Sequence, residues 1–136
     1  MILFHSTIDF QIFNKRTFAS WIKRVAKKEG ATVGDLNFIF CSDKFLLEKN
    51  KAYLKHNALT DIITFNYSDK HNISGDVFIS IDRVKENALL FSESFENELK
   101  RVIIHGVLHL LGYKDKSKKE KAIMRNKEDF YLSLQT

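Results

Sequence analysis

The stretch LKRVIIHGVLHLLGYKD, from Leu99 to Asp115, is apolar over most of the circumference of the helix that it would form. Its apolar positions include Leu99, Val102, Ile103, Val107, Leu108, Leu110 and Leu111. A helix that is hydrophobic nearly all round must be covered nearly all round by other elements. The sequence therefore predicts a central, buried helix that opens at Ser94 and ends at Gly112, with the rest of the domain packed about it.

The segments on either side of this helix predict a small α+β domain. Expected strands cover residues 2–10, 36–41, 61–67 and 75–81, and expected helices cover 14–30, 42–54, 82–91, 94–112 and the segment after 117. Two consecutive strands form a hairpin, so the order predicts a mixed four-stranded sheet packed with about five helices. No repeat, proline or linker interrupts the chain, and residues 1–136 are expected to form a single domain.

Short polar residues mark the expected helix starts. Ser42 or Asp43 is placed to cap the second helix and Asp82 the third, because such side chains accept hydrogen bonds from the free N–H groups of a first turn. Ser117 and Glu120 match the S-x-x-E capping box and open the last helix. Residues 75 and 76 are expected at the exit of the hairpin turn.

The composition is that of a globular protein in a reducing compartment. Of 136 residues, 44% are hydrophobic and 29% are charged, as in a folded domain. Cys41 is the single cysteine, so an intrachain disulfide and a cysteine-rich metal site are both excluded. The first residues lack the basic leader of a signal peptide, and no segment has the apolar length of a membrane span. We expect a soluble, cytoplasmic protein with no membrane partner.

The net charge of +5 favours an anionic partner such as nucleic acid. Much of the excess follows the central helix, in a run of seven basic residues: Lys114, Lys116, Lys118, Lys119, Lys121, Arg125 and Lys127. Such a run is usually a solvated helix face, but its position makes it a candidate for following an RNA backbone.

His105, His109 and Asp115 have the spacing of metal ligands. Imidazoles at i and i+4 lie on one face of a helix, about 5 to 6 Å apart at Cβ, and both can reach one ion. A left-handed turn at Gly112 would let the Asp115 carboxylate return to the same ion. Three protein ligands leave a coordination position open, which is typical of a catalytic site. The alternative is a pair of hydrogen-bonded core histidines before an ordinary helix stop.

The same spacing also occurs in metzincin peptidases, H-x-x-x-H-x-x-G-x-x-D. Those enzymes carry a catalytic glutamate directly after the first histidine, and this chain has Gly106 there. Glycine cannot act as a general base. The spacing therefore favours a metal site and argues against a metzincin-like peptidase.

The segment HGVLHLLGYKD, together with LTDIITF (59–65), GDVFIS (75–80), Asn50 and Tyr53, resembles the YbeY-type metal-dependent endoribonucleases. The motif of that family is H-G-x-L-H-L-x-G-Y-D-H, and its upstream segments are P-T-D-V-L-S-F and G-D-I-x-I-S. The resemblance implies an α+β fold, one zinc ion per chain, and cleavage of single-stranded RNA. It also implies a role in 16S rRNA 3′-end maturation and ribosome quality control on the small subunit, with ribosomal proteins or an assembly GTPase as further candidate partners.

Two departures from the family pattern affect the expected chemistry. Asp115 replaces the third histidine, which makes the site harder and favours divalent ions other than zinc as an alternative. Leu54 stands where the family commonly has an arginine implicated in catalysis, and an aliphatic side chain cannot clamp a phosphate. Lys55 or His56 is a candidate substitute for this arginine. The plainer interpretation is that Lys55 is a surface charge of the helix and His56 is a loop residue.

Thr60 and Asp61 precede an expected strand. Such a pair commonly forms local turn hydrogen bonds. The functional alternative is that the Asp61 carboxylate accepts a hydrogen bond from the free ring N–H of a metal-bound histidine.

Taken with the resemblance, these residues predict a metal-dependent hydrolase acting on RNA. The candidate catalytic residues are His105, His109 and Asp115, acting through the metal, with Asp61, Lys55 and His56. A non-catalytic RNA-binding ribosome-assembly factor with a structural metal is the alternative, and a metzincin-like peptidase is the third.

Overall fold

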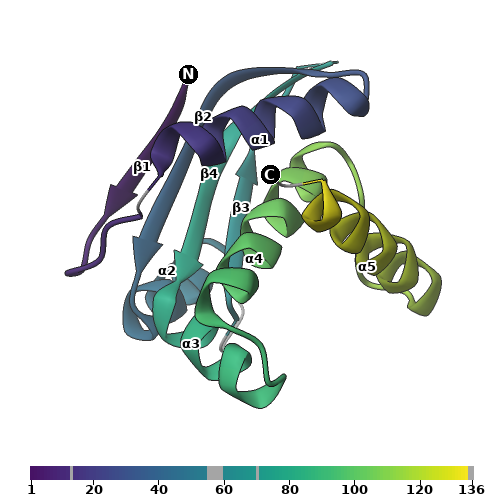
Figure 1. Cartoon of the computed structure of the whole chain (residues 1–136). Helices are drawn as coiled ribbons and strands as arrows, with labels where there is room; N and C mark the ends of the chain where they lie inside the picture. The colour runs from purple at the N-terminus through teal and green to yellow at the C-terminus, as the bar shows by residue number, and fades with distance from the viewer. Residues whose placement is uncertain (13, 55–59, 70, 135–136) are drawn as a thin grey trace.

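The computed structural model describes residues 1–12, 14–54, 60–69 and 71–134 (Figure 1). The elements follow the order β1 (Ile2–Ser6), α1 (Lys15–Lys28), β2 (Thr32–Cys41), α2 (Asp43–Leu54), β3 (Ile62–Asn66), β4 (Asn72–Ser80), α3 (Ile81–Leu90), α4 (Phe95–Leu110) and α5 (Lys118–Ser133). The α+β prediction is therefore confirmed, including its mixed sheet. Within the described residues, no helix has both the length and the apolar character needed to cross a bilayer.

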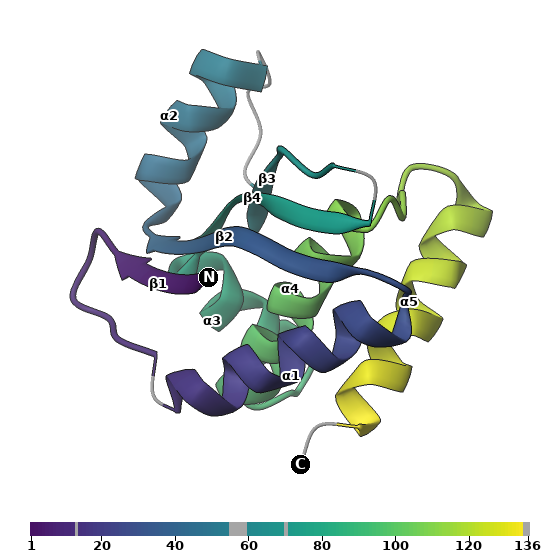
Figure 2. The same cartoon turned by 90° about the horizontal axis from the view of Figure 1, so that it is seen from above.

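The four strands form one sheet in the order β1-β2-β4-β3. Strands β1, β2 and β4 are parallel, and β3 pairs antiparallel with β4 as the predicted hairpin. Seen from above, α2 lies on one side of the sheet, whereas α1, α3 and α4 lie on the other (Figure 2). Helix α5 packs against α4, away from the sheet.

Helix α4 occupies the centre of the main hydrophobic core, as its apolar pattern predicts. Its side chains at Val102, Ile103, Ile104, Val107 and Leu108 are almost completely buried. Residues of α1, the sheet, α3 and α5 complete this core, and a smaller cluster of Cys41, Leu46 and Ile63 lies under α2. The core therefore fixes the position of the helix that carries both histidines.

Gly106 allows α4 to lie unusually close to the sheet. A Cβ atom at this position would stand 2.9 Å from Ile62 Cδ1 on β3 and 2.9 Å from Val77 Cγ1 on β4. Contacts this short force a neighbour to move. The residue after the first histidine is thus a glycine for packing reasons, and a glutamate could not occupy the position without separating helix from sheet.

We predict that Gly106→Ala lowers the free energy of unfolding by about 1 to 2 kcal/mol, because an overpacking cost of about 2 to 3 kcal/mol at Ile62 and Val77 outweighs the gain of about 1 kcal/mol in helix propensity. Urea denaturation measures the change. The control is Asn126→Ala on the exposed face of α5, which changes helix propensity alone. A Gly106→Ala protein as stable as the wild type would contradict the packing argument.

Strand β4 begins at Asn72, so the predicted start at residue 75 is wrong. Gly75 lies inside the strand opposite Asn66, and not at the exit of a turn. A Cβ atom there would contact the carbonyl oxygen of Phe65 and would lie 3.0 Å from Leu110 Cδ2. The glycine therefore serves the close approach of β3 and α4, which the local sequence does not reveal.

Other boundaries shift for tertiary reasons. The first strand ends at Ser6 instead of residue 10, and β2 begins at Thr32 with an irregular register between Val33 and Leu36. The cap of α3 is Ser80, whose hydroxyl accepts from Arg83 N at 3.1 Å, and not Asp82 as predicted. The Asp82 carboxylate instead accepts from the backbone N–H of Asp43, at the start of α2.

Candidate metal centre

The end of α4 directs the chain back toward its own histidines. Gly112 has φ 106°, and the N–H groups of Gly112 and Tyr113 donate to the carbonyls of His109 and Leu108, both at 3.0 Å. This is the Schellman arrangement that closes many helices. A Cβ atom at Gly112 would meet nothing within 4 Å, so the positive φ alone favours glycine. After this turn the chain runs back along α4, and the carboxylate of Asp115 lies beside the histidines of the helix.

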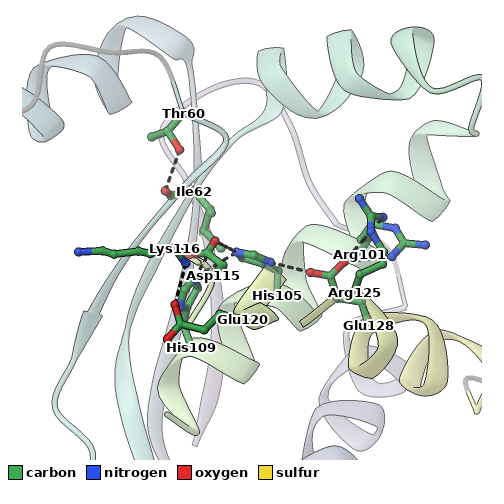
Figure 3. A network of polar contacts seen from close by, with 10 residues as sticks. All are labelled: Thr60, Ile62, Arg101, His105, His109, Asp115, Lys116, Glu120, Arg125 and Glu128. Carbon is green, nitrogen blue, oxygen red and sulfur yellow. Dashed lines mark hydrogen bonds and ion pairs between the residues drawn. The ribbon is translucent and has the colours of Figure 1, made fainter. Parts of the chain in front are cut away.

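Three ligand atoms converge as the spacing predicts (Figure 3). Asp115 Oδ2 lies 3.1 Å from His105 Nε2 and 3.5 Å from His109 Nε2. The two Nε2 atoms lie 3.0 Å apart. Ligands placed tetrahedrally at about 2.0 to 2.1 Å from one ion are separated by about 3.3 Å, so this donor set fits a divalent cation. In the described part of the chain, no other set of three His, Cys, Asp or Glu side chains is grouped in this way.

Glu128 on α5 orients the ring of His105. Its Oε2 lies 2.6 Å from His105 Nδ1, and its Oε1 accepts from the guanidinium of Arg101 at 3.0 Å. The Glu128 side chain is 6% exposed. The backbone of Tyr113 hydrogen-bonds His109 in turn. With these partners on each ring, both Nε2 atoms remain directed toward Asp115, as in metal sites whose histidines are held by outer carboxylates and carbonyls.

The pKa values of the two imidazoles are shifted in opposite directions. Burial lowers the pKa of His105, but the hydrogen bond to Glu128 and the charges of Glu128, Asp115 and Asp61 outweigh burial and raise that pKa overall. The pKa of His109 is lowered by burial and by the neighbouring His105. The carboxylates of Glu128, Asp115 and Asp61 around His105 therefore favour positive charge at this site.

Asp61 lies in the same pocket but does not hold a histidine ring as suggested. That role belongs to Glu128, a residue that the sequence pattern did not single out. The Asp61 carbonyl accepts from Ser80 N at 2.9 Å, and burial raises the pKa of its carboxyl group. Thr60 Oγ1 donates to the Ile62 carbonyl at 3.3 Å, which is the local turn bond. Lys55 and His56 lie outside the described residues, so their suggested role stays a prediction.

A signal for Glu128 was present in the sequence. Met124, Glu128 and Tyr131 are spaced i, i+4 and i+7, and all three are buried on the inner face of α5. A carboxylate on the apolar face of an amphipathic helix needs a partner. That partner, His105, is on another helix 23 residues earlier, and the sequence alone does not pair the two.

A pocket of about 390 Å³ opens beside the candidate metal ligands, between the end of α3, the outer side of α4 and helix α5. Its wall carries four carboxyl groups, of Asp61, Glu98, Asp115 and Glu128, and three cationic side chains, of Arg101, Lys121 and Arg125. Burial raises the pKa of Glu98. Two members of the predicted basic run thus line the pocket, whereas Lys114, Lys116, Lys118 and Lys119 are exposed.

Glu29, at the end of α1, connects the ligand loop to α5. Its carboxylate accepts from Tyr113 Oη at 2.6 Å, from Lys127 Nζ at 3.0 Å, and from Tyr131 Oη. Burial raises the pKa of Glu29, but these donors outweigh burial and lower it below 4.5. The position of the loop that bears Asp115 therefore depends on Glu29, which is distant from it in the sequence.

We predict that Glu29→Gln lowers the free energy of unfolding by about 1 to 3 kcal/mol near neutral pH, the range for hydrogen bonds to a charged group. Since the folded-state pKa is depressed, this stabilisation is present above the ordinary pKa and is lost as the pH falls through the folded value. The difference in free energy of unfolding between wild type and variant should therefore narrow as the pH falls below 4.5. Urea denaturation at a series of pH values from 7 to 3 measures this difference. Glu86→Gln, on the exposed face of α3, is the control. A gap that does not change with pH would contradict the assignment.

Comparison with known proteins agrees with this geometry. Residues 5–135 match the model of the family described as Endoribonuclease YbeY. The chain is 51% identical over 134 residues to Endoribonuclease YbeY of Flavobacterium psychrophilum, covering 98% of this chain and 96% of the relative. It is 51% identical to Endoribonuclease YbeY of Karelsulcia muelleri, covering 97% and 94%. The solution structure of TM1509 from Thermotoga maritima superposes with a TM-score of 0.68 at 28% identity, covering 98% and 87%. The chain therefore belongs to the YbeY endoribonuclease family.

Proposed function

We propose that the protein is a metal-dependent endoribonuclease that hydrolyses phosphodiester bonds in single-stranded RNA. His105, His109 and Asp115 would hold one zinc ion per chain, with another divalent ion as the alternative because an oxygen ligand replaces a nitrogen. The observation that carries the proposal is the convergence of these three donor atoms. Two of the residues that supply them, His105 and Asp115, line a pocket that also presents Lys121 and Arg125.

A divalent ion held by these residues would polarise a phosphate oxygen and would lower the pKa of a bound water toward about 7. The surrounding side chains would supply the remaining functions. Glu128 and the Tyr113 backbone keep the two rings oriented. Asp61 lines the same pocket with a raised pKa, which suits a group that exchanges a proton with the reacting oxygen.

The proposed substrate is pre-16S rRNA on the small ribosomal subunit, in 3′-end maturation and ribosome quality control. Family membership and the net charge of +5 support an RNA substrate. Ribosomal proteins or an assembly GTPase are proposed as further partners, and the cytoplasm as the location.

Metal removal and restoration test this function. The purified protein is treated with a chelator, dialysed, and assayed on single-stranded RNA before and after addition of zinc, manganese or magnesium, with elemental analysis of each sample. We expect cleavage to fall by on the order of 100-fold or more without metal and to return with one ion per chain. Undiminished cleavage by protein shown to be free of metal would refute the proposal.

A non-catalytic assembly factor with a structural metal is the second candidate, favoured by Leu54 in place of the family arginine. Such a protein would bind single-stranded RNA with and without metal as long as it remains folded, and would not cleave it. A peptidase is disfavoured because Gly106 is packed against β3 and β4 and leaves no room for a general base. Incubation with casein beside RNA separates that activity.

A further inference from the structure

An exposed aromatic ring stands at the rim of the pocket. Phe91, directly after α3, is 57% exposed and lines the pocket together with Arg101, Lys121 and Arg125. Its neighbours Leu89 and Leu90 are 80% and 72% exposed but do not line the pocket. A large apolar side chain left in water beside cationic groups needs an explanation other than core packing.

The backbone around Phe91 is fixed by hydrogen bonds. Ser92 adopts a left-handed conformation with φ 54°, and the N–H groups of Ser92 and Glu93 donate to the carbonyls of Leu89 and Ala88 at 3.3 and 2.9 Å. The next helix starts at once, with Ser94 as its N-cap. The backbone of Phe91 is therefore fixed at the turn between α3 and α4. Figure 1 shows that this turn leads directly into α4, the helix against which α5 packs.

The cations of the pocket differ in how firmly they are already paired. Arg101 is bound to Glu128 at 3.0 Å and to Asp129 at 2.8 Å, and its side chain is 21% exposed. Arg125 is 58% exposed and stands 3.8 Å from Glu128. Lys121 precedes Arg125 by one helical turn and is exposed. Arg101 thus holds Glu128, whereas Arg125 and Lys121 present their charge to the pocket.

An aromatic face beside a pair of cations matches the requirements of a single nucleic-acid strand. Proteins bind such strands by stacking bases on aromatic rings and by tracking the backbone with basic groups. The volume of about 390 Å³ lies within the range that accommodates a small ligand. Asp115 would be neutralised by a bound ion, and Glu128 already faces Arg101 and His105.

We propose that this pocket is a nucleotide subsite for single-stranded RNA, with a base stacked on Phe91 and the adjoining phosphate held by Arg125 and Lys121. The inference rests on the proposed function and adds the residues that select an unpaired strand. Bases in a duplex have no free face to offer the ring, so the subsite favours unpaired RNA over duplex RNA.

Photo-crosslinking and steady-state kinetics test the subsite. Single-stranded RNA carrying 5-iodouridine is irradiated with the metal-loaded protein, and the modified residue is located by mass spectrometry; we expect Phe91. Phe91→Ala should raise KM about 5- to 100-fold with kcat nearly unchanged, the range for loss of one stacked base. Phe91→Tyr should restore KM, because it keeps the ring. The matched control Leu90→Ala changes a neighbour that is even more exposed and lies outside the pocket lining, and it should leave KM unchanged.

The possible outcomes distinguish a failure of the subsite proposal from a failure of the proposed function. Normal RNA cleavage by Phe91→Ala with unchanged KM and a crosslink elsewhere would overturn the subsite and leave the proposed function standing. A crosslink at Phe91 in a protein that never cleaves RNA would support the subsite and overturn the function. Equal losses in Phe91→Ala and Leu90→Ala would indicate that the apolar turn as a whole, and not the aromatic ring, affects RNA binding, and would also overturn the subsite. Because Phe91 is exposed, its variants should fold, as urea denaturation would verify.

Discussion

Replacing His109 by alanine is expected to leave the protein without a stoichiometric metal ion and to reduce RNA cleavage by on the order of 100-fold or more. The ring supplies one of only three donor atoms, and the other two, from His105 and Asp115, stand 3.1 Å apart with nothing to replace it in the described residues. Elemental analysis of the purified variant and a cleavage assay on single-stranded RNA measure the two effects together.

The control for this variant is His71→Ala, which removes an exposed imidazole at the turn before β4, outside the pocket. It should retain metal and activity. Both proteins should unfold at similar urea concentrations in the presence of a chelator, since His109 contributes to the site more than to the core. Wild-type cleavage by His109→Ala would show that the His–His–Asp group is not the reactive centre.

The second large effect is expected at Glu128. Glu128→Gln keeps the shape of the side chain but places an amide between His105 and Arg101, and both of these partners require an acceptor. Loss of an outer hydrogen-bond partner of a metal-bound histidine typically weakens metal affinity 10- to 100-fold, and we expect about that change here. Competition with a chromophoric chelator measures the affinity directly, independently of RNA cleavage.

Asp129→Asn provides the matched control. Asp129 binds the same guanidinium of Arg101 at 2.8 Å but is 58% exposed and makes no contact with His105 in the described structure. Its loss should cost about 1 kcal/mol of stability or less, as for other exposed ion pairs, and should leave metal affinity unchanged. If the two variants weakened metal binding equally, the effect would come from displacement of Arg101 and not from the His105 ring.

The sequence predicted best those features that arise within one helix and its ends. The buried helix α4 follows from its own apolar pattern, and the structure brings His105 and His109 together because they lie one turn apart on it. Capping was equally local: Ser94 caps α4, and Ser117 with Glu120 forms the predicted capping box of α5.

What the sequence could not predict depends on contacts between distant segments. Gly75 looked like a turn residue because its constraint, the approach of Phe65 and Leu110, comes from other elements. Ser80 and Asp82 both have side chains that can cap a helix, so the local sequence does not choose between them. In the structure Ser80 caps α3, and Asp82 instead accepts a hydrogen bond from the start of α2. Glu128 was missed for the same reason: its role exists only once α5 packs on α4.

Helix α5 would carry both proposed roles on one element. Glu128 fixes a ring at the metal centre, and Lys121 and Arg125, within two turns of it, face the pocket. A displacement of α5 that changes the affinity for the ion must therefore also change the affinity for an anionic strand. Coupling between two binding sites is reciprocal. The factor by which the bound ion changes the affinity for the strand is therefore also the factor by which the bound strand changes the affinity for the ion. Because a bound ion would neutralise Asp115 and so favour an anionic strand, the occupancy of the candidate metal centre would rise with substrate, and protein short of metal would be loaded preferentially where RNA is present.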